Sequence, residues 1–216
     1  MAEAAAECAS LLDGVTGSHA LLLDATDGPI PQVPGIGRWT MLKLSAGGQL
    51  LAGPLRAEVD ALPFSDGSFS LVLIRHLLGA GTPAQPLVAE AARVLASHGL
   101  LCALEFHSIS LWRPWLLRRS SRGEESLRVV PPGRLQGILR ANGLMVRAQW
   151  RCGAPWPRAT GMQGLPRWTA EAAGAVYLLK ARKRDSSGVV RRLHSRRTRS
   201  AREQVPWAPG AQRTKA

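Results

Sequence analysis

The stretch Arg56–Leu78, RAEVDALPFSDGSFSLVLIRHLL, decides the fold of this 216-residue chain. Two carboxylates, Glu58 and Asp60, precede a Leu-Pro-Phe step and a Ser-Asp-Gly-Ser turn. The apolar run that follows, Ser70–Leu78, is continuous rather than alternating, which is typical of a strand that helices cover on both faces. We therefore expect a buried central strand whose preceding loop carries acidic side chains.

Five further apolar runs predict strands, and two segments predict helices. The apolar spacing over Thr82–Gly99 predicts a helix with Pro86 in its first turn and Gly99 as its C-terminal cap. A second helix is expected over Pro131–Gly143. This alternation predicts an α/β domain with a mostly parallel sheet and helices on both faces. The five runs are His19–Ala25, Trp39–Leu44, Leu100–Phe106, Leu144–Trp150 and Ala175–Arg182.

Basic residues concentrate at the C-terminal end of the chain. The formal net charge is +13, and from Lys180 onward twelve lysines and arginines face only Asp185 and Glu203. This end therefore carries +10, which leaves +3 for the preceding 179 residues. We expect a disordered, solvated tail over residues 183–216. Its run RRLHSRRTRS leaves open a weak, salt-dependent contact with nucleic acid.

The cysteines and the N-terminus exclude several classes of protein. Cys8, Cys102 and Cys152 are far apart, so neither a metal site nor a disulfide framework is expected. The N-terminus lacks the basic and apolar segments of a signal peptide, and no run approaches the roughly 20 apolar residues of a membrane helix. We expect a cytoplasmic protein with no membrane contact, in which a short segment, residues 1–19, precedes one folded domain, residues 20–182.

Several residues around the central strand recur at intervals that are typical of one enzyme family. They are Leu62–Phe64, Phe69, and Glu90 followed by Arg93–Leu95. In this pattern the chain resembles the class I S-adenosylmethionine-dependent methyltransferases, in the branch often called type 11, over Leu21–Leu104. The resemblance implies a single Rossmann-like methyltransferase domain, S-adenosyl-L-methionine as the cofactor, and a methyl acceptor that the sequence does not identify.

The turn after the first strand departs from the family pattern. Three glycines in the family let the backbone approach the cofactor closely. Here Asp24 takes the acidic position before them, Thr26 the first glycine position, Gly28 the second and Ile30 the third. Ser45 or Ala46 stands where the family ends its next strand with an acid that binds the ribose. Each lost charge-assisted hydrogen bond costs roughly 1.5–3 kcal/mol, so we expect weakened cofactor binding.

The resemblance assigns further residues to the cofactor site. Glu58 and Asp60 fall at acidic positions near the adenine, so Asp24, Thr26, Gly28, Glu58 and Asp60 are the expected cofactor ligands. His76 follows the strand on the side of the cofactor's methionine and the substrate, where we expect it to contact the cofactor and to serve as a catalytic base. Ordinary polar loop and strand-end residues are the alternative interpretation for these side chains.

Two functions remain open at this point. The first is transfer of a methyl group from S-adenosylmethionine to an unidentified acceptor. The second is a catalytically inactive methyltransferase-like scaffold or binding protein, whose basic tail engages nucleic acid or an acidic partner. The incomplete glycine turn and the missing ribose acid favour the second function, because both features weaken cofactor binding.

Overall fold

The structure, a computed structural model, describes residues 12, 14–26, 28–45, 49–108, 110, 129–153 and 174–184. The chain divides into two compact units, Met1–Ser186 and Ser187–Ala216, and every described residue lies in the first. The predicted tail therefore falls outside the described residues except for Lys183, which ends the last strand, and Arg184.

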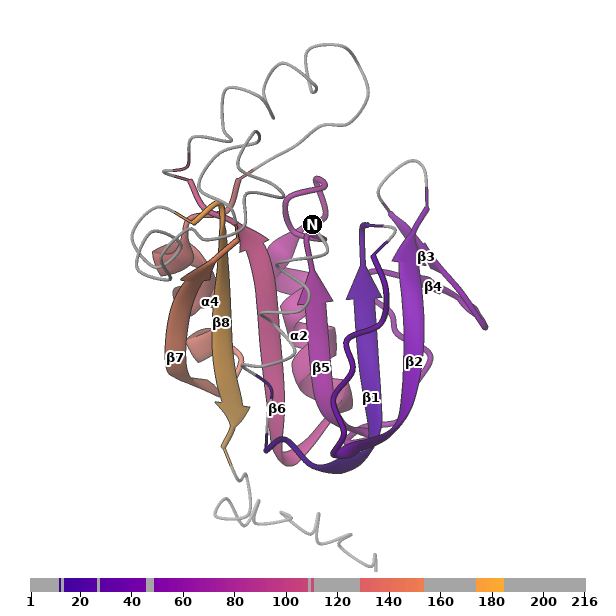
Figure 1. Cartoon of the computed structure of the whole chain (residues 1–216). Helices are drawn as coiled ribbons and strands as arrows, with labels where there is room; N and C mark the ends of the chain where they lie inside the picture. Colours follow the sequence, from indigo (N-terminus) through magenta and orange to yellow (C-terminus); the bar gives the residue numbers. More distant parts are fainter. Residues whose placement is uncertain are drawn as a thin grey trace, which may run out of the picture. The chain divides into compact units, whose positions relative to one another are not determined.

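Eight strands form one sheet in the order β4-β3-β2-β1-β5-β6-β8-β7 (Figure 1). The four central strands, β2, β1, β5 and β6, are parallel, whereas both edges of the sheet are antiparallel. The α/β class, the parallel centre and all six predicted strands are confirmed. The bounds are β1 (Gly17–Asp24), β2 (Ile36–Leu44), β3 (Leu50–Ala52), β4 (Arg56–Glu58), β5 (Phe69–Arg75), β6 (Leu95–Phe106), β7 (Leu144–Cys152) and β8 (Val176–Lys183).

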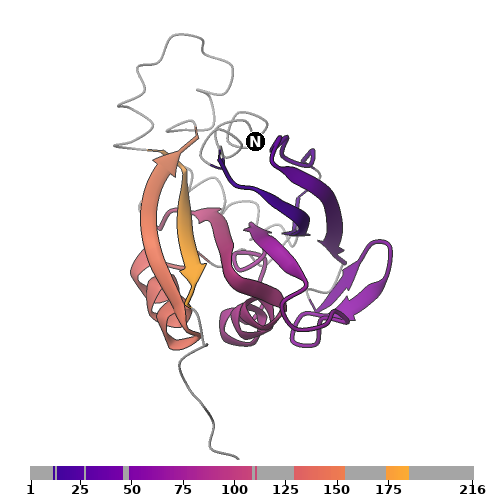
Figure 2. The same cartoon turned by 90° about the horizontal axis from the view of Figure 1, so that it is seen from below.

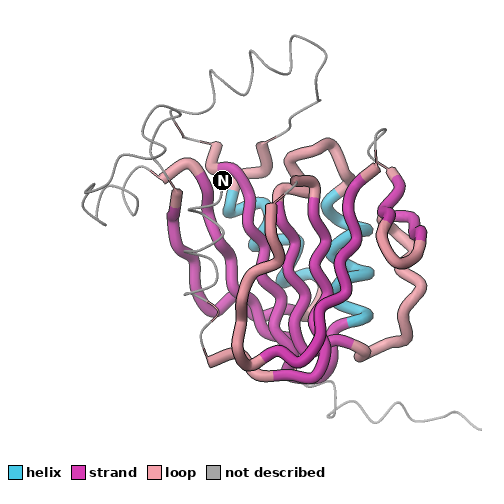
Figure 3. The backbone as a smooth tube through the Cα atoms, turned by 45° about the vertical axis from the view of Figure 1, so that its right-hand side comes forward, coloured by secondary structure: helices cyan, strands magenta, loops and turns pink. Residues whose placement is uncertain are grey.

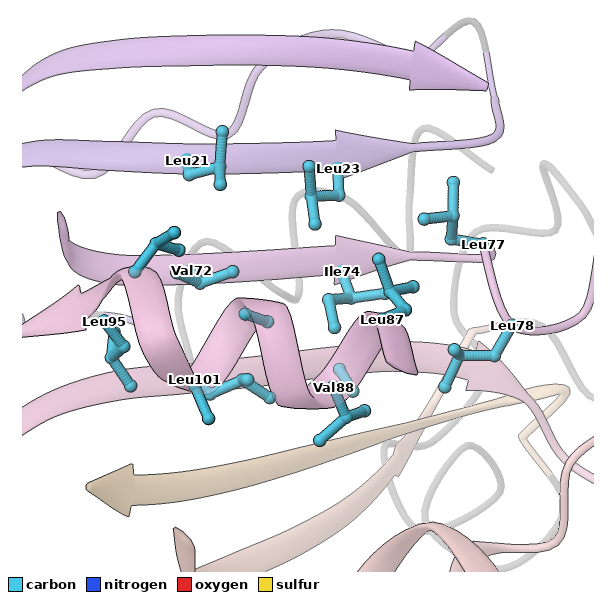
Figure 4. Packing of buried hydrophobic residues seen from close by; sticks show 14 of the residues in the cluster. Leu21, Leu23, Val72, Ile74, Leu77, Leu78, Leu87, Val88, Leu95 and Leu101 are labelled. Carbon is cyan, nitrogen blue, oxygen red and sulfur yellow. The ribbon is translucent and has the colours of Figure 1, made fainter. Parts of the chain in front are cut away.

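The two described helices, α2 (Ala84–Val94) and α4 (Pro132–Ala141), pack on the same face of the sheet (Figures 2 and 3). The apolar stripe of α2 packs against β6 and that of α4 packs against β7 and β8, and Figure 4 shows Leu87 and Val88 of α2 among the buried side chains of the sheet. Burying this stripe is what stabilises each short helix, since isolated helices of this length are marginal in water.

The opposite face of the sheet carries a second apolar cluster. Its members include Leu22 and Leu73 from the strands, with Val33 from the connection between β1 and β2. That connection, residues 25–35, contains no helix among its described residues. The short connection is already visible in the sequence, because few residues separate the first strand from the second.

Gly99 does not cap α2, so that prediction is wrong. The helix ends at Val94, and Leu95 already has the extended backbone of β6. Lys183 satisfies the end of the helix instead, because its Nζ donates to the carbonyls of Ala92 and Leu95 at 2.6 Å each. Gly99 lies within β6, where a Cβ would come within 2.8 Å of the Ala96 carbonyl oxygen.

A short antiparallel hairpin, β3 and β4, extends the sheet beyond β2. The sequence analysis did not predict it and placed Glu58 in a loop, whereas Glu58 is the last residue of β4. Three-residue strands show too little alternation to be recognised from sequence. The backbone pairing of Leu50 with Glu58 and of Leu51 with Ala57 defines the hairpin.

Glu90 and Arg93, two residues of the family pattern, attach the loop before β5 to helix α2. Arg93 forms a two-pronged ion pair with Glu90, with both N–O distances at 2.8 Å, and donates to the carbonyls of Leu62 and Phe64 at 2.8 Å. Glu90 in turn accepts from the Leu62 N–H at 2.9 Å, and Asp66 accepts a further bond from Arg93. These residues therefore fix the entry of the chain into β5.

Candidate functional site

The order in which the strands are added to the sheet reverses between β1 and β5. From β1 the chain continues into β2 on one side, and β5 later pairs on the other side. Ligands of open α/β sheets bind at the carboxyl ends of the strands at such a switch point. Asp24 and Arg75 are the last residues of β1 and β5, and their backbones are partners in the sheet register.

A buried ion pair joins these two residues. The Arg75 Nε donates to Asp24 Oδ1 at 2.9 Å, and Nη2 donates to Oδ2 at 2.5 Å. The remaining guanidinium hydrogens reach the carbonyls of Gly28 and Pro29, at 2.8 Å each. Only 4% of the Arg75 side chain is exposed and none of the Asp24 side chain. Such fork geometry is among the strongest polar contacts in proteins.

The predicted residues Asp24, Thr26 and Gly28 are brought together here, but they bind one another and Arg75. The Thr26 N–H and hydroxyl both donate to Asp24 Oδ1 at 2.9 Å. A Cβ on Gly28 would lie 3.2 Å from three atoms of the guanidinium. The sequence analysis missed Arg75, although an arginine inside a continuous apolar run is a usable signal, because buried charges are almost always paired.

His76 follows Arg75 in the sequence, and both its backbone conformation and the environment of its side chain are unusual. Its φ is 53°, a left-handed conformation that non-glycine residues rarely adopt, and its N–H donates to the Leu104 carbonyl at 2.8 Å. The ring lies 4.4 Å from that of Phe106, and Nδ1 is buried with no hydrogen-bond partner among the residues that the structure describes. Strained residues with unsatisfied groups are concentrated at functional sites.

Burial also sets the charge of His76. Desolvation lowers the pKa of the imidazole to about 3, and the nearby Arg75 lowers it further, while Asp24 acts in the opposite direction. The ring is therefore neutral at physiological pH. A base of this pKa accepts a proton only weakly, so His76 is better suited to hydrogen bonding than to general base catalysis.

Glu105 shapes the turn that follows His76. Its carboxyl group accepts from the N–H groups of Leu78 and Gly79, at 2.9 and 3.2 Å. Desolvation raises the pKa of Glu105 to about 8, although these hydrogen bonds oppose the shift. The carboxyl group is consequently largely protonated at neutral pH. The Thr82 hydroxyl, just beyond this turn, is also buried without a partner.

Glu58 and Asp60 lie farther along the same edge of the sheet. Both are exposed, and Glu58 stands level with the end of β2 because Leu50, its partner, accepts a hydrogen bond from Ser45 N–H. Two strands, β2 and β3, separate β4 from β1. Three strand spacings of about 4.8 Å place β4 roughly 14 Å from β1. Glu58 and Asp60 therefore lie toward the carboxyl ends of the parallel strands, without contact to Asp24.

Residues 40–103 match the family model described as "Methyltransferase domain". This segment of the chain is therefore similar to a methyltransferase domain. This agrees with the resemblance seen in Leu62–Phe64, Glu90 and Arg93, and the matched segment runs from β2 to the middle of β6. No curated protein matches the chain.

Solved structures of methyltransferases share the fold of this chain. A methyltransferase candidate from Bacillus halodurans C-125 gives a TM-score of 0.59 at 14% identity, over 83% of this chain and 98% of that one. A candidate S-adenosylmethionine-dependent methyltransferase from Listeria monocytogenes gives a TM-score of 0.57 at 14% sequence identity. The match covers 83% of this chain and 96% of that one. A SAM-dependent methyltransferase from Thermotoga maritima gives a TM-score of 0.56 at 13% sequence identity. The match covers 84% of this chain and 88% of that one. The fold is that of the class I S-adenosylmethionine-dependent methyltransferases.

The residues of the switch point fit a cofactor only in part. The unpartnered Nδ1 of His76 and its strained backbone are what a ligand site would leave. In contrast, Arg75 occupies the hydrogen-bonding atoms of Asp24 and covers Gly28. A cofactor cannot contact these two residues in the family's manner while the guanidinium keeps this position.

Among the described residues, no group of three or more His, Cys, Asp or Glu side chains is placed to hold a metal ion. None of the described helices is both long enough and apolar enough to span a membrane.

Proposed function

We propose that this chain is an S-adenosylmethionine-dependent methyltransferase that acts on an acceptor yet to be identified. The cofactor would lie along the carboxyl ends of β5, β1, β2 and β4. The observation that carries the proposal is His76, which has a buried, unpartnered Nδ1 on a strained backbone beside the switch point of a methyltransferase domain. An unsatisfied buried nitrogen costs about 1–3 kcal/mol, which a ligand hydrogen bond would recover.

The chain's own residues have distinct roles in this proposal. The sulfonium of S-adenosylmethionine supplies an activated methyl group when the cofactor is bound. Glu58 and Asp60 are exposed acceptors for the hydroxyl and amino groups of a nucleoside. His76 contributes a neutral imidazole, which orients a ligand by hydrogen bonding. Methyl transfer that depends on proximity and alignment does not require a strong base.

The second candidate function is a non-catalytic methyltransferase-like binding protein. Its supporting observation is Arg75, whose four hydrogen bonds to Asp24, Gly28 and Pro29 fill the place at the switch point that a ligand would use. Breaking a buried pair of this kind is strongly unfavourable, by about 3–5 kcal/mol when one partner is lost. If ligand binding does not offset that cost, the fold remains as a scaffold.

Calorimetric titration of the full chain with S-adenosylmethionine and S-adenosylhomocysteine tests the proposal. We expect heat of binding at high micromolar ligand, and we expect Glu58→Gln to weaken binding about tenfold, because a charge-assisted hydrogen bond to the ligand is lost. Asp66→Asn is the matched control, since Asp66 is an exposed carboxylate that binds Arg93 away from this edge.

The outcomes separate the two candidates. Binding that Glu58→Gln weakens and Asp66→Asn leaves unchanged supports the methyltransferase. The absence of heat with either ligand, for a protein whose circular dichroism spectrum shows it folded, contradicts it and supports the non-catalytic protein.

A further inference from the structure

A basic hollow lies at the opposite end of the strands from the switch point. It has a volume of about 370 Å³, and Thr16, Ser70, Leu100 and Arg182 are among the residues that line it. Thr16 and Ser70 lie at the amino ends of β1 and β5, and Leu100 pairs with Arg182 where β8 ends. Figure 1 shows the arrowhead of β8 at the opposite end of the sheet from those of β1 and β5.

Three cationic side chains converge on this hollow, Arg147 from β7 and Lys180 and Arg182 from β8. No acidic residue is present among the described residues that line it. Like charges that share a concave surface repel one another and raise the local concentration of anions. The described residues that line the hollow therefore give it a positive potential.

Local irregularities of the backbone bring these groups together. Pairing of β7 with β8 shifts between Val146 and Ala148, which makes Arg147 the extra residue of a β-bulge. Bulges redirect side chains and are enriched next to binding sites. Among the described residues, Arg147 makes no hydrogen bond or ion pair, and its side chain is exposed.

The far wall of the hollow has a second strained segment. His98 has a φ of 61°, in the left-handed region. Its carbonyl accepts from Arg182 Nε at 3.0 Å, which holds the guanidinium against this wall. Strain of this kind persists where the surrounding structure enforces it, and it recurs at ligand sites.

We propose that this hollow binds the phosphate group of a small phosphorylated molecule. Arg147, Lys180 and Arg182 bind the phosphate oxygens, and Thr16 and Ser70 are hydroxyl-bearing residues of the same lining. Arginine forks match phosphate geometry, and the volume lies within the range of about 300–1,000 Å³ for small-molecule sites. Because the hollow and the switch point lie at opposite ends of the strands, the site is independent of methyl transfer.

The test uses inorganic pyrophosphate as the probe on the full chain, at constant ionic strength. We expect saturable calorimetric binding, with amide NMR shifts at Thr16 and Leu100 and none at Asp24 or His76. Arg147→Gln should weaken binding about tenfold, because it removes a charge-assisted contact but no contact within the fold. Arg134→Gln is the control, since it removes an equal charge from the exposed surface of helix α4.

Three results would overturn the proposal. The first is no saturable binding of pyrophosphate by a folded protein. The second is equal weakening by Arg147→Gln and Arg134→Gln, which would show that net charge alone attracts the anion. The third is binding of a twelve-nucleotide single strand that Arg147→Gln weakens, without binding of pyrophosphate, which would assign the hollow to nucleic acid. Arg182→Gln provides a second variant should Arg147→Gln fail to fold.

Discussion

Two arginine–carboxylate pairs organise this domain, and they differ chiefly in burial. Arg75 and Asp24 join the carboxyl ends of two central strands, with 4% and 0% of their side chains exposed. Arg93 binds Glu90 and Asp66 at the start of β5, with 33% of its side chain exposed and 81% of that of Asp66. The two pairs have the same chemistry, but one lies at the switch point and the other at the surface.

The difference shows how location changes the role of one interaction. At the surface, water solvates either partner when the other is lost, so the pair mainly holds a loop in place. At the switch point, each partner depends on the other for its solvation, and the pair fills the position that the fold offers to a ligand. The Glu90–Arg93 motif therefore holds a loop in place, whereas the Arg75–Asp24 pair occupies the end of the strands at the switch point.

Breaking the buried pair should have the largest effect. Asp24→Asn leaves the Arg75 guanidinium buried without a counter-charge, so we expect the free energy of unfolding to fall by about 3–5 kcal/mol. Replacing both partners, as Asp24→Leu with Arg75→Met, should cost much less, because no buried charge remains. Urea denaturation of the three proteins measures this difference. Equal losses in the single and double variants would contradict the account.

Two buried groups near this pair, His76 and Glu105, should make the stability of the protein depend on pH. The pKa of His76 is about 3 in the folded protein, below its ordinary value of 6.5, so the stability it contributes is lost as pH falls from about 6.5 to about 3. The pKa of Glu105 is about 8, above its ordinary value of 4.5, so stability is lost as pH rises from about 4.5 to about 8.

Melting temperatures between pH 3.5 and 9 check both effects. His76→Asn should reduce the loss on the acid side, since asparagine tolerates the left-handed backbone. Glu105→Gln should reduce the loss on the alkaline side. Variants whose pH profiles run parallel to that of the wild type would show that neither group titrates as its burial requires.

Breaking the surface pair should have a smaller effect. Arg93→Ala removes the bonds to Glu90 and to the carbonyls of Leu62 and Phe64, and we expect a loss of about 1–2 kcal/mol after allowing for partial exposure. Hydrogen exchange should increase in the amides of the loop before β5, including Leu62. Exchange that increases equally at the switch point would contradict a local role.

The smallest effect is expected for Asp66→Asn. The carboxylate of Asp66 is exposed, so its removal should change the free energy of unfolding by less than about 1 kcal/mol. The effect should disappear in 1 M salt, because salt screens exposed pairs. A loss as large as that of Asp24→Asn would overturn the distinction between the two pairs.

Much of the fold was predictable because burial leaves a pattern in the sequence. Continuous apolar runs located β1, β5 and β6, and helical spacing located α2 and α4. The hairpin of β3 and β4 was not predictable, since its strands are too short for a periodic pattern. The end of α2 was misplaced at Gly99 because Lys183, 91 residues after Ala92, satisfies its carbonyls.

The neighbourhood of Asp24, Thr26 and Gly28 was predictable from the sequence, but the contacts of their side chains were not. The resemblance placed Asp24, Thr26, Gly28 and His76 around one switch point, and the structure brings the first three into contact with one another or with Arg75. Which atoms those side chains engage depends on tertiary contacts between β1 and β5. The hydrogen bonds of Arg75 to these residues could be seen only in the structure, although the sequence already shows an arginine within an apolar run.

The most direct test of the central claim, that Arg75 and a cofactor compete for the switch point, is the affinity for S-adenosylhomocysteine in two folded variants. Arg75→Met removes the guanidinium, and Arg38→Met removes an exposed arginine on β2 as the control. We predict that Arg75→Met binds at least about tenfold more tightly than the wild type, and that Arg38→Met binds as the wild type does. Unchanged or weaker binding in Arg75→Met would contradict the account.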